Sequence, residues 1–243
     1  MSEINIVCPS RKRSKSFETN IENMTVLVAK KELANYKETI GNFEIITHNN
    51  LKSLSEIRQF AYDKFGDVFF VDDDIVSVER VYETKNSKLT PIEIFNLIQK
   101  TYLQAKDLNA FLFGFNSDPS PTHYNQHKPF MLNGYINGCA LGILKNKNLF
   151  FSKKTIACES HWLALLNAYH NRFCFIDKRY HFRQKTNSTF NLVGGQSGLR
   201  TLETEKQDTI FLKKMFGNSV MLKKEKNKTK RIHEYQRVLN IKL

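Results

Sequence analysis

"VFFVDDDIVSV", residues 68–78, is the stretch that decides how this chain is interpreted. Four apolar residues run directly into three aspartates, and the apolar pattern then resumes. A short continuous apolar run is typical of a strand that is buried on both faces of a sheet. The stretch therefore predicts a buried strand at 67–71 whose end carries three adjacent carboxylates.

The segments around this stretch alternate between strand and helix patterns. Residues 53–66 have apolar side chains at helical spacing behind a capping box of Ser53 and Glu56, and Pro91 stands in the first turn of a second amphipathic pattern. Such alternation predicts an α/β fold, with a sheet covered by helices. The expected strands are 4–8, 25–29, 43–47, 67–71, 110–115, 137–144 and 172–176, and the expected helices are 30–41, 53–66, 90–108, 158–170 and 203–217.

Two segments predict irregular loops. Residues 116–130 contain three of the five prolines, and residues 185–200 are rich in Gly, Ser and Asn. Long loops in compact domains are often functional. We therefore expect both segments to contribute to a site.

Composition limits the class of protein. The chain has 243 residues, of which 41% are hydrophobic, so it is long enough to bury a substantial core. Its longest apolar runs are too short to span a bilayer, and its start has no basic region followed by an apolar stretch, so we expect neither a transmembrane segment nor a signal peptide. Four scattered cysteines without CxxC spacing predict a reducing, cytoplasmic location and no zinc site.

The net charge of +13 favours a polyanionic partner such as nucleic acid, an anionic membrane or nucleotide phosphates. A coding bias toward Lys, Asn, Ile and Phe is the plain alternative. Basic residues cluster at 11–15 and at 223–231. The second cluster predicts a solvated basic extension over 223–243.

Three adjacent carboxylates at the end of a strand favour a cation site. In open α/β sheets, ligands collect at the carboxyl ends of the strands, and Mg²⁺ and Mn²⁺ take a few carboxylates together with substrate phosphates. An acidic turn that caps the next element is the structural alternative. A Walker-B strand is excluded because the chain has no GxxxxGK[ST] string, and Ile75 and Val76 break an EF-hand loop.

Five stretches, taken in order, resemble glycosyltransferases of the GT-A fold. More narrowly, they resemble the phage and bacterial enzymes associated with TET/JBP-type dioxygenases, which modify hydroxymethylated pyrimidines in DNA. The resemblance covers about residues 4–200. The stretches are "VCPSRKR" (7–13), "SEIRQFAYDKFGDVFFVDDDI" (55–75), "NGYINGCALGILKN" (133–146), "ACESHWLALLNAYHNRFCFIDKRYHF" (157–182) and "NLVGGQSG" (191–198).

This resemblance implies one GT-A (Rossmann-like) domain over 1–222, with a mixed central sheet flanked by helices. The nucleotide-sugar-binding half would cover about 1–80 and the acceptor-binding half about 81–222. The implied reaction moves a hexose or pentose from a nucleotide sugar, with UDP as the expected nucleotide, to a hydroxyl of an acceptor. The implied cofactor is Mn²⁺ or Mg²⁺, held on the donor diphosphate by the aspartate motif.

The resemblance also implies a role for each matched residue. Asp74 would ligate the metal, Asp72 would ligate it or touch the ribose, and Asp73 would contact the donor. A later histidine, His181, would complete the metal site, and Glu159 would be the catalytic base. Ser160 departs from the family pattern, where Asp is common, and this leaves open whether the enzyme inverts or retains. The expected donor contacts are Pro9, Ser10, Arg11, Arg13, Arg58, Gly194 and Gly195, with Gln196 and Ser197 in the same loop.

Each of these residues also has an ordinary structural interpretation. Arginines lie on surfaces, a first-turn Glu stabilises a helix, and a Gly pair is often a plain turn.

Double-stranded DNA is the expected acceptor, because the positive charge suits phosphate contacts. Reaching a pyrimidine hydroxymethyl group predicts an everted nucleotide stacked on aromatic rings. A glycan or small-molecule acceptor is the alternative, for which the last residues, 231–243, would form a basic amphipathic helix. A non-catalytic DNA-binding module and a metal-dependent nuclease or nucleotidyltransferase are rivals of other classes. The available aromatic side chains are Trp162, Tyr124, Tyr135 and Phe130, and His123 and His127 are further candidate acceptor contacts.

Overall fold

The computed structural model describes residues 3–85, 87–185, 194–196, 198–223 and 234–241. Its helices are α1 (Leu33–Ile40), α2 (Leu54–Phe65), α3 (Pro91–Asp107), α4 (Glu159–Asn171) and α6 (Leu202–Phe216). Its strands are β1 (Asn5–Pro9), β2 (Met24–Ala29), β3 (Glu44–His48), β4 (Val68–Val71), β5 (Ile75–Arg80), β6 (Ser87–Lys88), β7 (Leu112–Asn116), β8 (Phe130–Met131), β9 (Ala140–Ile143), β10 (Phe175–Gln184), β11 (Val220–Leu222) and β12 (Arg237–Leu239).

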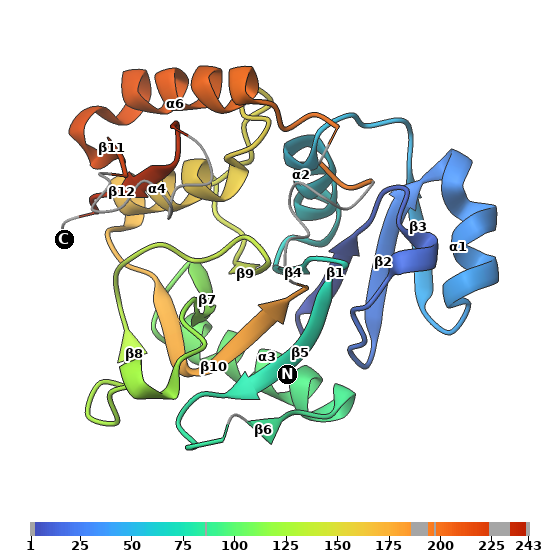
Figure 1. The fold of residues 1–243 in the computed structure, drawn as a ribbon, viewed down its shortest axis with the longest axis horizontal. Helices are drawn as coiled ribbons and strands as arrows, with labels where there is room; N and C mark the ends of the chain where they lie inside the picture. Colours follow the sequence, from blue (N-terminus) through green and yellow to red (C-terminus); the bar gives the residue numbers. More distant parts are fainter. Residues whose placement is uncertain (1–2, 86, 186–193, 197, 224–233, 242–243) are drawn as a thin grey trace.

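The strands form one mixed ten-stranded sheet and a separate β11–β12 hairpin. The order in the large sheet is β3-β2-β1-β4-β9-β7-β10-β5-β6, and β8 pairs with β10 (Figure 1). The first four strands pair in parallel, whereas β9 is antiparallel to both β4 and β7. The predicted α/β class, a mixed central sheet flanked by helices, is confirmed.

The strand order creates a switch point between β1 and β4. From β1 the chain moves outward through β2 to β3, and it then returns to place β4 on the other side of β1. Ile6 lies opposite Phe69 and Val7 opposite Phe70, so the carboxyl ends of the two strands lie side by side. Ligands of open α/β sheets bind at such points, outside the carboxyl ends of the strands.

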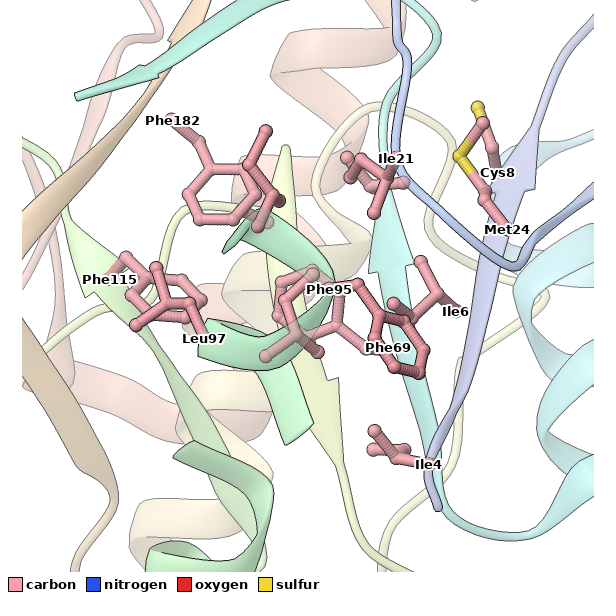
Figure 2. Packing of buried hydrophobic residues seen from close by; sticks show 14 of the residues in the cluster. Ile4, Ile6, Cys8, Ile21, Met24, Phe69, Phe95, Leu97, Phe115 and Phe182 are labelled. Carbon is pink, nitrogen blue, oxygen red and sulfur yellow. The ribbon is translucent and has the colours of Figure 1, made fainter. Parts of the chain in front are cut away.

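Alternate residues of β4 supply two cores, one on each face of the sheet. Phe69 and Val71 join a cluster that includes side chains of α3, and Figure 2 shows Phe69 among them. Val68 and Phe70 join the cluster formed by α2, α4 and α6. All four side chains are fully buried, as the continuous apolar run predicts.

Local signals in the sequence placed most elements within a few residues of where they lie. The capping box of Ser53 and Glu56 is present at α2, and Pro91 is the first residue of α3. β5 was not predicted, and β10 continues to Gln184, well beyond the expected end at 176. The two omissions are linked, because β10 and β5 pair with each other along residues 180–184.

The C-terminal residues differ from the expected solvated extension. Residues 224–233 lie outside the described residues, but residues 237–239 form strand β12 rather than an amphipathic helix. Arg237 is buried and donates to Glu205 Oε2 at 2.6 Å and to Thr209 Oγ1 at 2.8 Å, both on α6. The predicted domain boundary at 222 therefore falls inside a hairpin that packs on the main body.

None of the described helices combines the length and the apolarity that a membrane crossing requires.

Candidate active site

A cavity of about 460 Å³ lies at the switch point. Pro9 and Ser10 approach it from the end of β1, and Asp72, Asp73 and Asp74 approach it from the end of β4. The cavity thus occurs where the topology of the sheet predicts a ligand. Its further lining includes Arg11, Arg13, Lys52, Tyr135, Asn137, Gly138, Glu159, Ser160, His161, Gln184, Gly195, Gln196, Arg200 and Gln236.

The main chain of the aspartate turn is fixed by its neighbours. The Asp72 amide donates to the Cys139 carbonyl at 3.0 Å, and the Asp72 carbonyl accepts from Thr19 Oγ1 at 2.6 Å. The Asp74 carbonyl accepts from the Lys185 amide at 2.8 Å. The three carboxylates are therefore presented by a held backbone rather than by a free loop.

Asp73 supports the loop that follows β1. Its Oδ2 accepts from Ser10 Oγ at 2.5 Å, and its Oδ1 accepts from Arg13 Nη1 at 2.7 Å. The side chain is 4% exposed, so both oxygens are used inside the protein. Although Asp73 lines the cavity, the structure makes it a partner of Arg13 rather than a free donor contact.

Asp72 and Asp74 share one partner, Gln184 at the end of β10. The Gln184 Nε2 lies 3.3 Å from Asp72 Oδ2 and 3.1 Å from Asp74 Oδ1. The amide therefore holds positive partial charge between two carboxylates, where a cation would also be stabilised. Sequence reasoning missed Gln184 because it expected β10 to end at 176.

Burial raises the pKa of Asp72 to about 7. The Arg58 guanidinium, 2.9 Å away, lowers this pKa, whereas Asp74, Asp73 and Glu159 raise it further. A carboxylate in this state gains from a nearby cation, because the cation offsets both the desolvation and the repulsion by its neighbours.

Arg58 lies beneath the cavity and does not face it. Its side chain is fully buried, with Nη2 donating to Asp72 Oδ1 at 2.9 Å and to the Gly138 carbonyl at 2.7 Å. Its Nη1 donates to Glu159 Oε1 at 3.1 Å, and the guanidinium lies over the Phe70 ring. The predicted donor contact of Arg58 is not seen in this structure, because Nη1 and Nη2 are used on Glu159, Asp72 and the Gly138 carbonyl, and the side chain does not line the cavity.

Glu159, which was predicted to be the catalytic base, begins α4 and lines the cavity. Ser160, which departs from the family pattern, makes a 2.9 Å hydrogen bond with Tyr135. His161 was missed by sequence reasoning, although it stands two residues after Glu159. It stacks on Tyr135 with ring centroids 4.6 Å apart, and burial lowers the pKa of His161 to about 3.

The glycine pair packs against the loop after β1. The Gly195 amide donates to the Arg11 carbonyl at 2.8 Å, and both glycines have positive φ. A Cβ on Gly194 would lie 2.7 Å from the Arg11 carbonyl oxygen, and one on Gly195 would lie 2.9 Å from Arg13 Cζ. A side chain at Gly194 would therefore clash with backbone, and one at Gly195 would have to displace the Arg13 guanidinium. Gly195 and Gln196 line the cavity, and Ser197 lies outside the described residues.

The predicted histidine ligand is not at the aspartates. His181 Nδ1 is 2.8 Å from the Asn116 carbonyl oxygen, and the side chain does not line the cavity. It precedes Gln184 by three residues, which is about 10 Å along an extended strand. The assignment of His181 as a metal ligand is therefore wrong in this structure, and Gln184 stands where that ligand was expected.

Of the remaining aromatic and histidine candidates, some line the cavity and others lie away from it. Tyr135 lines the cavity, but Trp162 is buried in the core. His123 and His127 lie in the exposed part of the 116–130 loop, away from the cavity lining, and Phe130 lies with them on the β8 side.

The donor set fits a divalent cation that also binds substrate. Among the described residues, no three or more His, Cys, Asp or Glu side chains come together as a metal-binding group. Mg²⁺, however, is commonly bound through one or two carboxylates, with phosphate oxygens and waters completing the shell. Asp72 and Asp74 would supply those two carboxylates. Rotation of the Gln184 amide by half a turn would add a third hard oxygen.

Comparison with known proteins gives no family for this chain. No family model matches it, and no curated protein matches it in sequence. Among solved structures, it is similar to A197 from STIV, with 10% sequence identity, 77% of this chain and 88% of that chain covered, and a TM-score of 0.36.

Proposed function

We propose that this protein is a metal-dependent glycosyltransferase of the GT-A type. It would move a sugar from a nucleotide sugar, with UDP as the expected nucleotide, to the hydroxyl of a hydroxymethylated pyrimidine in DNA. One observation carries the proposal: Asp72 and Asp74 face a cavity at the β1–β4 switch point with an amide nitrogen held between them.

The cavity suits a nucleotide diphosphate in size and charge. A volume of about 460 Å³ lies within the range of small-molecule and cofactor sites. Arg11 and Lys52 line it and carry positive charge, and Arg200, which also lines it, pairs with Glu205. A diphosphate bound in the cavity would be compensated by basic side chains and by the cation.

The residues of the chain divide the work of the transfer. The bound Mn²⁺ or Mg²⁺ would neutralise charge on the departing diphosphate. In an inverting transfer, Glu159 accepts the proton of the acceptor hydroxyl as that hydroxyl oxygen bonds to the anomeric carbon. The electron pair of the broken bond leaves with the β-phosphate oxygen. Arg58 holds Glu159 and Asp72 in fixed positions, so it is a positioning residue.

DNA is supported as the acceptor by charge. The net charge of +13 favours a polyanionic partner over a neutral glycan. We place the reaction in the cytoplasm of a bacterial or phage-infected cell. All four cysteines are buried free thiols, which suits a reducing compartment.

Mass spectrometry of nucleosides from hydroxymethylated duplex DNA tests the reaction directly. After incubation with Mn²⁺ and a panel of nucleotide sugars, we expect one hexose or pentose adduct. Glu159→Gln should reduce its formation by at least about 100-fold, the scale of general-base catalysis. Glu203→Gln, which changes an exposed glutamate on α6, is the matched control. If no adduct forms with any donor while a glycan is modified, the DNA acceptor is wrong.

A further inference from the structure

A second cavity lies toward the other end of the β5–β10 ladder. It measures about 640 Å³ and is lined by Tyr82, Pro121, Tyr124, Gln126, Arg179 and Tyr180. We call it the tyrosine groove. Its lining residues belong to the segment that follows β5, the middle of β10, and the 116–130 loop; β5, β8 and β10 are labelled in Figure 1. None of these side chains lines the first cavity, at the β1–β4 switch point, which we call the donor cavity. None of them has a role in the proposed transfer.

Part of the tyrosine ring surface stays open, although the Arg179 guanidinium lies over the Tyr180 ring, 5.6 Å from its centroid. Tyr82 meets Tyr180 edge to face, with centroids 5.9 Å apart and rings inclined by 87°. Tyr82 and Tyr124 lie 6.4 Å apart with a tilt of 54°. An edge-on contact covers the face of only one ring of the pair, and Tyr82 remains 43% exposed. The groove therefore retains ring surface on which a flat ligand can stack.

The framework of the groove is held in place before any ligand binds. Arg179 is fixed by a two-point contact with Asp177 at 2.9 and 2.7 Å, and its guanidinium lies 4.8 Å from the Phe130 ring centroid. On the loop side, Asp118 accepts from the Ser120 amide at 2.9 Å and contacts His123 at 2.7 Å. A preformed groove loses little conformational entropy when it binds.

Basic residues outnumber acidic ones in the segments that frame the groove. The segments that frame it, 80–88, 116–130 and 178–180, contain six Lys or Arg residues and two acids, Glu83 and Asp118. Arg80 and Arg179 pair with acids outside these segments, Glu93 and Asp177. The excess then rests on lysines, which are Lys85, Lys88, Lys128 and Lys178.

We propose that the tyrosine groove binds single-stranded nucleic acid, stacking unpaired bases on its tyrosines while the surrounding lysines contact phosphates. Basic surfaces with exposed aromatic rings bind single strands in this way, without strong sequence preference. A neutral sugar ring would also stack on tyrosine, but it would gain nothing from the lysines. The charge therefore favours the nucleic acid.

The groove is also within reach of the donor cavity. Tyr180 and Gln184 are four residues apart on β10, which is about 13 Å. A stacked strand covers that distance in about four nucleotides. A strand that followed β10 out of the groove would be long enough to reach Asp72 and Asp74. Binding at the groove does not depend on the transferase proposal, because it requires neither metal nor nucleotide sugar.

Fluorescence anisotropy with labelled dT₁₂ and U₁₂, in EDTA and without nucleotide sugar, tests this inference. We expect binding that weakens with salt, and a loss of about 5- to 50-fold for Tyr82→Ala and for Tyr124→Ala, the effect of removing one stacking ring. Tyr82→Phe keeps the ring and should bind within about twofold of the wild type. Tyr169→Ala, which removes a tyrosine that is 69% exposed on α4, is the matched control.

Three results would overturn the inference. These are no binding of either oligonucleotide by the wild type, equal binding by Tyr82→Ala and Tyr169→Ala, or displacement of dT₁₂ by a neutral oligosaccharide at similar concentration. Circular dichroism of each variant separates a lost contact from a lost fold. If the protein binds dT₁₂ but transfers no sugar, this inference is supported and the transferase proposal is contradicted.

Discussion

Three identical residues in a row have different roles. Asp73 uses both oxygens on Ser10 and Arg13, whereas Asp72 and Asp74 share the Gln184 amide at the cavity. The sequence predicted that this triplet would be the site. It gave no means of deciding which aspartate is structural, because that depends on a strand end more than 100 residues away. Arg13 was predicted as a donor contact of the first loop, and in the structure it pairs with Asp73.

Substitutions of Asp73 and Asp74 should have different effects on stability, because only Asp73 is assigned a structural role. We expect Asp73→Asn to lower the free energy of unfolding by about 3 kcal/mol, because it leaves the buried Arg13 guanidinium without its closest carboxylate. Asp74→Asn should cost less than about 1 kcal/mol, since Arg13 lies 3.6 Å away and Asp73 still pairs with it. Urea denaturation measures both, and equal losses would contradict the division of roles.

His161 should make the protein sensitive to acid. Its pKa is lowered to about 3, below its ordinary value of 6.5, because burial disfavours the charged ring. The folded state then binds fewer protons than the unfolded state between these values. Stability is complete above about pH 6.5 and falls as the pH is lowered, by up to about 1.4 kcal/mol per pH unit.

Replacing His161 by Phe tests that origin. The variant keeps an aromatic ring beside Tyr135 but cannot take up a proton. Between pH 6.5 and 5, its urea midpoint should fall less steeply than that of the wild type. Identical slopes would show that other groups, such as His48 and His181, whose pKa values burial also lowers, cause the acid sensitivity.

At the scale of elements, local signals were sufficient for some parts and not for others. The capping box at Ser53 and the apolar run of β4 are signals within a few residues, and both elements lie where they were expected. The antiparallel insertion of β9 between β4 and β7 leaves no local trace, because direction depends on distant pairing. The second half of β10 is polar, so its sequence does not have the apolar pattern of a buried strand. It belongs to the sheet because it pairs with β5, which is distant in the sequence.

That non-local pairing also explains which site residues were missed. Asn137 precedes β9, and because β9 runs against β4, its beginning meets the end of β4 at the cavity. Gln184 reaches the aspartates through the β5–β10 ladder. Residues predicted by resemblance alone had mixed outcomes, because Glu159 lines the cavity whereas Arg58 is covered and His181 lies elsewhere.

The contact between the glycine loop and the β1 loop yields a test at this scale. Gly195→Ala places a Cβ 2.9 Å from the Arg13 guanidinium at a positive φ, so it should shift Arg13 and weaken UDP binding by about 10-fold, the equivalent of 1.4 kcal/mol. Gly217→Ala has the same positive φ of 56° but meets nothing within 4 Å. It should lower stability without changing UDP affinity.

If calorimetry gives the same UDP affinity for Gly195→Ala as for the wild type, the glycine loop does not shape the donor cavity. Gly198→Ala, with open space around it, serves as a second control and should change neither affinity nor stability.

At the scale of the whole molecule, the fold gathers distant segments around one cavity. The ends of β1, β4 and β10, the start of α4, and Gln236 beside β12 all line it. The C-terminal hairpin is tied to α6 by Arg237, so a segment that composition alone marked as a solvated extension contributes to the site. The net charge of +13 is a property of the whole surface, and it supports a polyanionic acceptor without placing it.

Calorimetric titration of UDP with Mn²⁺ and with EDTA tests the central claim, that Asp72 and Asp74 hold a divalent cation on the donor diphosphate. We predict at least about 10-fold tighter UDP binding with Mn²⁺, because the cation joins the diphosphate to the two carboxylates. Asp74→Asn should lose this gain, whereas Asp107→Asn, which changes an exposed aspartate at the end of α3, should keep it. Equal UDP affinity of the wild-type protein with and without Mn²⁺ would contradict the account.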